Sequence, residues 1–256
     1  MNPAEIAAYI GAAAWAPQIT AWAYRRFAKP RVRLIPQASV ELGYTTFGAI
    51  FNVRFAMSTK GKDAVVERIG VTIQHEQGER HEFVWMGMRE TFSEITDAQG
   101  NRQVVERDQP AIAVKLSTAI LLEKLVRFQE PSYHEAHRPL VEALVSEHHR
   151  LKAAEVDYRQ QVLGSKEFSA LMAFYKTRFW WKSGQYTATF AIRSPDRAEL
   201  TPGSYRFRLP QYDVDALGKN LDVIRVDYTN STMSDVADYQ AAPVLWSWRN
   251  VPLSPT

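Results

Sequence analysis

The chain has 256 residues, of which 46% are apolar and 23% charged, a composition typical of a folded domain and unlike that of a disordered protein. Zero cysteines exclude disulfides, thiolate nucleophiles and cysteine-ligated metals, and they permit a reducing compartment. The first 33 residues hold five of the 31 basic and one of the 28 acidic residues, which leaves 26 against 27; this balance argues against nucleic-acid binding.

The chain opens with an uncharged stretch over residues 6–24, IAAYIGAAAWAPQITAWAY. As a helix it would be about 28 Å long, close to the thickness of the hydrocarbon core of a bilayer. Basic residues follow it, which by the positive-inside rule places the rest of the chain in the cytoplasm. These flanking residues are Arg25, Arg26, Lys29, Arg31 and Arg33. The pattern predicts a membrane anchor over residues 1–30 at the inner membrane, with a domain over residues 31–256 on its cytoplasmic side.

Two other interpretations of this stretch stay open. Eight alanines and the Pro17-Gln18 pair make it only weakly hydrophobic, so it would also suit a helix that docks on its own domain or in a homo-oligomer, in a cytoplasmic protein. The third interpretation is a secretory signal cleaved near Ala23, which would make the chain an exported binding protein.

From Val32 onward the apolar residues alternate with a period of two, which is typical of half-buried strands. The predicted strands cover residues 32–36, 47–57, 65–75, 80–88, 185–193, 204–209 and 243–252. A helical period interrupts them, and it predicts an insertion over residues 119–182 in which Pro139 begins one helix and Ser165 caps the next. A third helix is expected over residues 214–228.

One short motif resembles a known family at the level of the fold. Leu200-x-Pro202-Gly203-x-Tyr205 is similar to the tyrosine corner of immunoglobulin-like and fibronectin type III domains. The resemblance implies a mainly β protein: an antiparallel immunoglobulin-like β-sandwich with a helical insertion and a preceding N-terminal helix. An arrestin-like or other antiparallel sandwich fits the strand pattern as well.

No G-x-S-x-G, H-E-x-x-H, G-x-G-x-x-G or P-loop string occurs, and no cofactor is expected. If the hairpin centres on Gly78, His75 and His81 face each other across it. With Glu76 or Glu79 they would begin a metal site, which leads to an alternative function as a metal-assisted hydrolase. The competing interpretation is an aromatic pair at one end of the sandwich.

Other polar clusters have structural interpretations. We expect packing or capping roles for the four remaining histidines, although they would also serve the hydrolase alternative. These are His134, His137, His148 and His149. Asp213 and Asp215 suit the start of a helix better than a cation site. The Asn-Ser-Thr string at residues 230–232 would be idle in the cytoplasm.

Aromatic and cationic residues are concentrated in residues 174–186, and they include Arg178, Trp180, Trp181 and Lys182. Such mixtures occur in buried cores, in protein interfaces and at membrane surfaces. We take these four residues as a candidate partner surface. The expected function is that of a membrane-tethered cytosolic adaptor or sensor without catalytic activity, which binds a protein partner.

Overall fold

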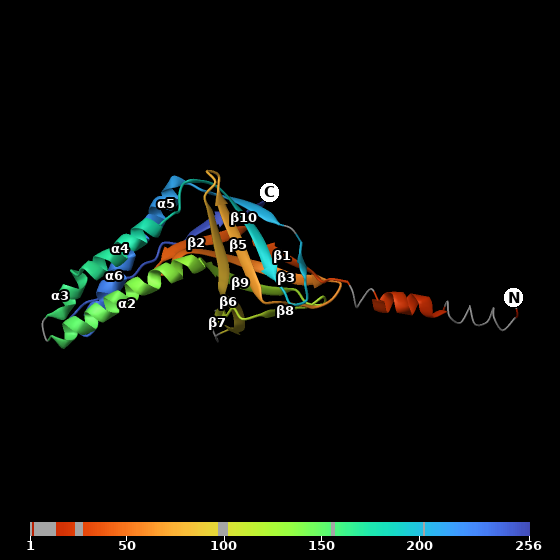
Figure 1. Cartoon of the computed structure of the whole chain (residues 1–256), viewed down its shortest axis with the longest axis horizontal. Helices are drawn as coiled ribbons and strands as arrows, with labels where there is room; N and C mark the ends of the chain where they lie inside the picture. Colours follow the sequence, from red (N-terminus) through yellow and green to blue (C-terminus); the bar gives the residue numbers. More distant parts are fainter. Residues whose placement is uncertain (1, 3–13, 24–27, 97–101, 155–156, 202) are drawn as a thin grey trace.

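The fold is built around one curled β-sheet, with the helices of the body gathered at one end (Figure 1). The computed structural model describes residues 2, 14–23, 28–96, 102–154, 157–201 and 203–256, and for residues 90–96 and 102–106 it describes only the backbone. The strands of the main sheet are β1 (Arg31–Pro36), β2 (Ser39–Thr45), β3 (Gly48–Lys60), β5 (Arg68–His75), β6 (Arg80–Thr96), β7 (Arg102–Pro110), β9 (Leu122–Gln129), β10 (Gly184–Arg193), β11 (Glu199–Leu200), β12 (Ser204–Leu209), β13 (Arg249–Pro252) and β14 (Ser254–Pro255). The short strands β4 (Ala64–Val66) and β8 (Val114–Leu116) pair with each other. The helices are α2 (Pro131–Ala153), α3 (Tyr158–Leu163), α4 (Lys166–Arg178), α5 (Gln211–Gly218) and α6 (Asn220–Met233).

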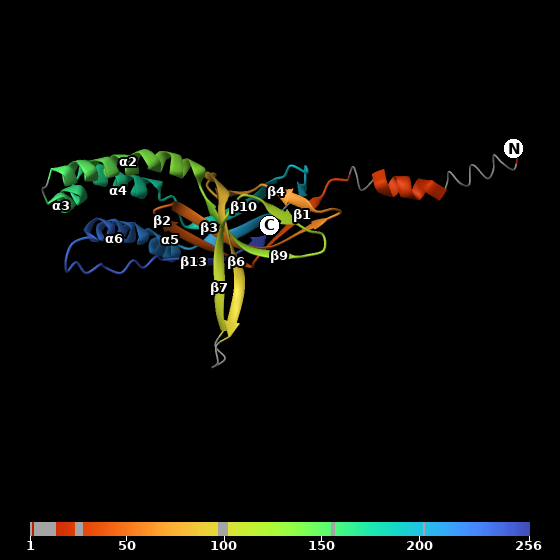
Figure 2. The same cartoon turned by 90° about the horizontal axis from the view of Figure 1, so that it is seen from below.

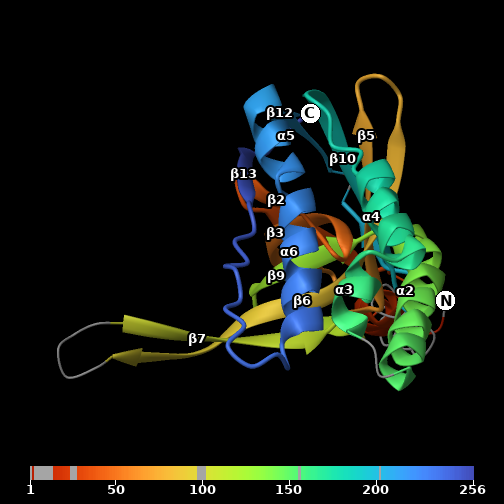
Figure 3. The same ribbon diagram turned by 90° about the vertical axis from the view of Figure 1, so that its left-hand side faces the viewer.

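Two long strands organise the sheet, whose order is β11-β1-β3-β9-β6-β5-β10-β12-β14. Strand β3 pairs with β2 through its first half, with β1 through its second half and with β9 along its other edge. Strand β6 pairs in turn with β5, β9 and β7. Beyond the body, β6 and β7 continue as a two-stranded ribbon (Figure 3).

The sheet curls until strands far apart in its order touch each other. Four strands separate β3 from β12 in the order. Nevertheless, the ring centroid of Phe51 on β3 lies 5.9 Å from that of Phe207 on β12, and that of Phe55 lies 5.0 Å from that of Phe190 on β10. All four rings are buried, and each contributes roughly 1.5–3 kcal/mol relative to exposure. This aromatic core lies inside the curl.

The chain is mainly β, as predicted, but an immunoglobulin-like antiparallel sandwich is not confirmed. The sheet is mixed, because β1 and β11 are parallel, and it forms a half-barrel instead of two separate layers. The cause is β6, which bonds to β9 and to β5 and so keeps both halves in one sheet. Tyr205 lies on β12 with its ring against Gly203, where an added Cβ would be 3.0 Å from Tyr205 Cε2.

Strand prediction succeeded where the alternation is strong and failed where it is weak. The strand predicted over residues 204–209 is β12, and the strand over residues 185–193 is β10. Of residues 243–252, only the last four form a strand. The prediction missed β2, β7 and β9. Strand β9 is central in the sheet, although it lies within the stretch assigned to the helical insertion.

The helices between β9 and β10 form the predicted insertion, with narrower limits. They run from Pro131 to Arg178 instead of from 119 to 182. The first helix begins at Pro131 and contains Pro139, which was expected to start it. Proline suits the first helical position because its missing N–H has no partner to lose there. His134 and His137 therefore lie one turn apart on α2.

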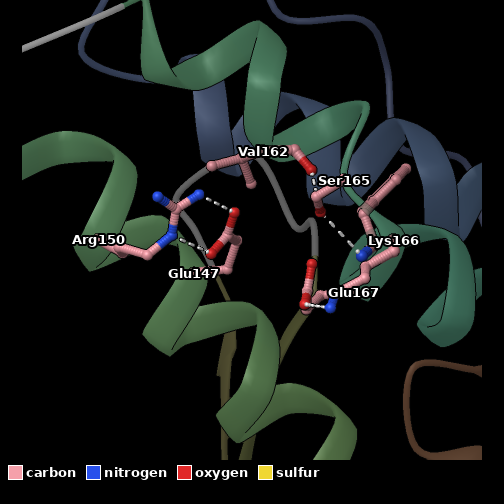
Figure 4. A network of polar contacts seen from close by, with 7 residues as sticks. Glu147, Arg150, Val162, Ser165, Lys166 and Glu167 are labelled. Carbon is pink, nitrogen blue, oxygen red and sulfur yellow. Dashed lines mark hydrogen bonds and ion pairs between the residues drawn. The ribbon is translucent and has the colours of Figure 1, made fainter. Parts of the chain in front are cut away.

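Ser165 caps α4, as predicted. Its Oγ accepts a hydrogen bond from Phe168 N at 3.1 Å and donates one to Val162 O at 2.7 Å (Figure 4). On the facing part of α2, Arg150 makes two hydrogen bonds of 2.7 Å with Glu147. The cap satisfies an otherwise unpaired N–H group at the helix start.

A buried network of hydroxyl groups joins the helices to the sheet. The Tyr44 hydroxyl on β2 donates to Tyr175 O at 2.6 Å. The Tyr175 hydroxyl lies 2.7 Å from His137 Nε2 and 2.9 Å from the Tyr228 hydroxyl. Burial raises the pKa of Tyr175 far above its usual range, so its hydroxyl stays protonated. The network links α2, α4 and α6, which form the two helical layers seen in Figure 2.

The transmembrane helix predicted at the N-terminus is not found in the part of the chain that the structure describes. Residues 14–23 of this stretch are helical. No helix in the described part of the chain is long and apolar enough to cross a membrane. Residues 1, 3–13 and 24–27 of the predicted anchor, with Arg25 and Arg26, lie outside the described residues.

The three described basic residues after this stretch lie in or contact the folded domain. Lys29 Nζ lies 2.9 Å from Glu199 Oε1. Arg31 and Arg33 are exposed residues of β1, opposite Lys60 and Ser58 of β3. Their positions follow from the sheet edge that β1 forms with β3 and β11. Whether these residues also flank a membrane stays a prediction.

Candidate ligand-binding cleft

A cleft of about 530 Å³ lies on the face of the sheet opposite the aromatic core. Its floor comes from β2, β3, β9 and β6. Its wall comes from α6 and from residues 240–248, which we call the strap; the strap runs back alongside α6 (Figure 3). Six charged or amide side chains line it: Glu41, Asn52, Arg89, Arg127, Gln129 and Asp227. The remaining lining consists of two threonines, three aromatic residues and two aliphatic ones: Thr45, Thr46, Phe47, Trp246, Trp248, Ile50 and Leu125.

Strand alternation places the polar floor of the cleft. Phe51 and Val53 point into the aromatic core, so Asn52 between them points to the opposite face. Glu41 on β2 and Arg127 on β9 are its direct cross-strand neighbours. Three strands therefore present an acidic, an amide and a basic side chain in one row.

Asn52 is buried in the floor of the cleft and lacks one hydrogen-bond partner in the part of the chain that the structure describes. It is 5% exposed, and its Nδ2 donates to Glu41 Oε2 at 2.9 Å. Its Oδ1 is buried and has no hydrogen-bond partner among the described residues. Leaving such an atom without a partner costs about 1–3 kcal/mol. A group bound in the cleft that donates a hydrogen bond to Oδ1 would remove this cost.

Two arginines share one carboxylate at the end of the cleft. Arg89 Nε lies 2.9 Å and Arg127 Nη1 3.3 Å from the carboxylate oxygens of Asp108 on β7. The side chains of both arginines are about one third exposed. The shared carboxylate orients two guanidinium groups toward the same region.

Two asparagines of α6 hold the strap through paired hydrogen bonds. Asn220 is fully buried; its Nδ2 donates to Ser247 O at 2.9 Å, and its Oδ1 accepts from Ser247 N at 2.7 Å. Asn230 binds Ala242 in the same manner, at 2.7 and 3.1 Å. Each amide replaces the backbone partner that an irregular segment lacks. Asn230, considered above only as a glycosylation acceptor, is thus a structural residue.

Ser247 lies between Trp246 and Trp248, so the buried clamp fixes both indole rings. The ring of Trp248 lies on Gly43 of β2, where an added Cβ would be 2.6 Å from Trp248 Cε3. Only glycine allows this approach. The strap therefore holds the aromatic wall of the cleft against the sheet.

The predicted metal pair is not formed. Ile73 pairs with His81, and Val71 with Phe83, so the hairpin is shifted by two residues from the predicted register. Gly78, with φ of +97°, ends the turn instead of centring it, which suits a three-residue hairpin loop. His81 stacks on Trp180 with ring centroids 3.8 Å apart.

His75 and Glu79 of that predicted site have other hydrogen-bond or ion-pair partners. His75 Nδ1 accepts from Gln77 N at 3.3 Å, and its Nε2 lies 3.3 Å from Ser183 O. Glu79 forms an ion pair with Lys182, and this hydrogen bond holds the pKa of Glu79 below its usual range. The described residues contain no group of three or more His, Asp or Glu side chains suited to a metal ion.

The other candidate ligands are dispersed. His134 Nε2 lies 2.8 Å from Gln129 Oε1, whereas His137 belongs to the tyrosine network. Burial lowers the pKa of both, and the charge of His134 lowers that of His137 further. Asp213 lies in the first turn of α5, where it pairs with Arg249 at 3.1 Å. Asp215 accepts from Gln211 at 2.8 Å.

The aromatic part of the predicted partner surface is largely internal. Trp181 is 2% exposed and donates to Gly43 O at 3.1 Å, so it is not available to a partner. Trp180 is half-buried between His81 and Phe83. Arg178 and Lys182 are exposed. Trp180 and Trp181 therefore serve as packing residues inside the fold.

Sequence reasoning missed the cleft because its residues come from five separate segments. The alternation around Asn52 was visible, and it signalled a polar residue on a strand that is otherwise apolar. Its neighbour Arg127 lies on the strand that was not predicted. No protein-family model, no curated protein and no solved structure matches this chain, so the assignment of the cleft rests on geometry.

Proposed function

We propose that this chain is a non-catalytic recognition protein, an adaptor or sensor, and that the cleft holds its ligand. The observation that supports the proposal is Asn52, which lines a cleft large enough for a small molecule and whose buried Oδ1 has no partner among the described residues. An unpartnered buried acceptor of this kind lowers the stability of the fold, and a bound ligand that donates to it offsets that cost. The absence of cysteine suits a reducing compartment, and a cytoplasmic location is part of the proposal.

The ribbon of β6 and β7 supports a protein partner. Its outer backbone pairs run from Ser93 with Val105 to Thr96 with Arg102. An isolated two-stranded ribbon is marginally stable in water, and β7 pairs only with β6 in the described part of the sheet. The unpaired edge of β7 is a template on which another chain can add a strand. In a recognition protein with a ligand cleft and such an edge, binding of the protein partner would depend on whether the cleft holds its ligand.

Ligand binding can be tested on the full chain with a thermal-shift screen of a small-molecule library. Trp248→Ala removes an aromatic wall of the cleft. Leu245→Ala is the matched control, because Leu245 lies on the same strap, is 73% exposed and does not line the cleft. We expect compounds that raise the Tm of the wild type and of Leu245→Ala but not that of Trp248→Ala. Equal shifts in all three proteins would contradict binding in the cleft.

The ribbon needs a separate experiment. Replacing residues 95–103 with Asn-Gly would close the Glu94–Val104 pair through a two-residue turn. Capture of partners from a lysate, followed by mass spectrometry, compares this variant with the wild type. We expect at least one protein to be captured by the wild type alone. Identical sets of captured proteins, with the shortened variant still folded by circular dichroism, would refute the role of the ribbon.

A further inference from the structure

The hydrogen-bond donors and acceptors of the cleft indicate the chemistry of its ligand. Asn52 requires a donor. The orientation of its amide is determined by Glu41, because a carboxylate accepts hydrogen bonds and so needs the NH₂ group opposite it. The part of the Asn52 amide without a partner is therefore the carbonyl oxygen Oδ1, and a ligand must donate an O–H or N–H group to it.

The opposite side of the cleft supplies donors. Arg127, the cross-strand neighbour of Asn52, carries five N–H groups; its closest carboxylate contact is the 3.3 Å ion pair with Asp108. Gln129 also lines the cleft, and its Oε1 lies 2.8 Å from His134 Nε2, which leaves its NH₂ group on the donor side. A ligand that spans the floor must therefore donate at one end and accept at the other.

The charge of the lining favours a neutral ligand. The lining carries two arginines and two acids, Glu41 and Asp227. Asp108 adds a third carboxylate that contacts both arginines, so the cleft has no excess of positive charge. An anion would pair with the arginines but would set its oxygens against the Asn52 carbonyl and the Glu41 carboxylate. A cation would satisfy those acceptors but would face two guanidinium groups. The hydroxyl is the neutral group that both donates and accepts.

The aromatic wall adds a second requirement. Trp246 and Trp248 are half-buried and line the cleft with Phe47, which is 55% exposed. Tryptophan offers a large flat apolar surface that contributes through burial of area. The bound molecule therefore has a flat apolar face as well as hydroxyl groups at its edge, and saturated sugar rings combine both.

We infer that the cleft binds a neutral polyhydroxylated ligand of the saccharide class. A ring face lies on the tryptophan wall, while edge hydroxyls donate to Asn52 Oδ1 and accept from Arg127. The inference rests on the proposed function, because it requires that the cleft is a binding site. It adds the class of ligand that the site selects.

The test uses the full chain on an array of neutral and acidic glycans, followed by titration calorimetry with each glycan bound. Three proteins accompany the wild type: Asn52→Leu, Trp248→Ala and the control Leu245→Ala. Asn52→Leu keeps the number and branching of the side-chain heavy atoms and removes the acceptor together with the donor to Glu41. We expect a neutral glycan to bind, with its Kd raised at least tenfold in Asn52→Leu and in Trp248→Ala and unchanged in Leu245→Ala. Circular dichroism checks that each variant is folded.

Two other probes test whether the cleft binds a ligand of a different class. Tricarballylate supplies three carboxylates and spermidine three amines, without a ring. If either binds in a manner that depends on Trp248 while no neutral glycan does, the saccharide inference is wrong and the cleft remains a binding site. Glycan binding that survives both cleft substitutions also overturns the inference. If neither glycans nor these probes bind, and the library screen yields no ligand that depends on Trp248, the proposed function fails as well.

Discussion

The strap depends on one buried amide, and Asn220→Ala removes it. The side chain is fully buried and makes two hydrogen bonds to the backbone of Ser247. Each bond contributes about 1 kcal/mol net, and a partly buried Ser247 N–H or C=O group left without a partner costs up to about 1–3 kcal/mol more. The substitution also leaves a gap beneath the strap. We therefore expect the free energy of unfolding to fall by about 2–4 kcal/mol.

Asn230→Ala provides the comparison, because it removes the same pair of bonds at Ala242, together with one from the Tyr239 hydroxyl, from a half-buried position. Water can replace the lost bonds there, so we expect a loss of only about 0.5–1.5 kcal/mol. Urea denaturation followed by tryptophan fluorescence and by far-ultraviolet circular dichroism measures both losses. A loss for Asn220→Ala that is no larger than that for Asn230→Ala would refute the view that the buried clamp holds the strap.

Three further predictions concern the sheet and the helices. Gly43→Ala should push Trp248 off β2 and cost about 1–3 kcal/mol of unfolding free energy; unchanged denaturation and tryptophan emission would argue against this contact. Tyr175→Phe should cost about 1–3 kcal/mol, because His137 Nε2 loses its partner in the buried network, and a loss below about 0.5 kcal/mol in urea would contradict it. The pKa values of His134 and His137 are lowered in the folded state from 6.5, so the unfolded chain binds more protons just below that pH and stability should decrease as the pH falls through 6.5. His137→Gln should make this decrease shallower in denaturation experiments at stepwise lower pH, and an unchanged slope would exclude His137 as a contributor.

Some features of the fold were predictable from the sequence because they depend on neighbours in the chain. The alternation in β10 and β12 specifies which face of each strand is buried, and β12 begins and ends where the pattern does. Ser165 caps α4 because the N–H group that it accepts from lies three residues away. Composition and periodicity also indicated a mainly β chain with a helical insertion.

Other local signals were ambiguous and misled the prediction. A proline suits the first turn of a helix, and Pro139 was assigned to that position, but the helix begins at Pro131. Gly78 marked a turn correctly, but a glycine can end a hairpin loop as well as centre it. That difference of one position in the turn moved His75 and His81 out of register.

The sequence alone determined the elements whose hydrogen bonds and burial patterns are local: the strong strands, the turns and the cap of α4. Only the tertiary structure decided which strands lie side by side, because pairing joins residues that are distant in the chain. The curl of the sheet comes from the three successive pairings of β6. The cleft comes from the same source, since Glu41, Asn52 and Arg127 meet only when β2, β3 and β9 align and the strap closes over them.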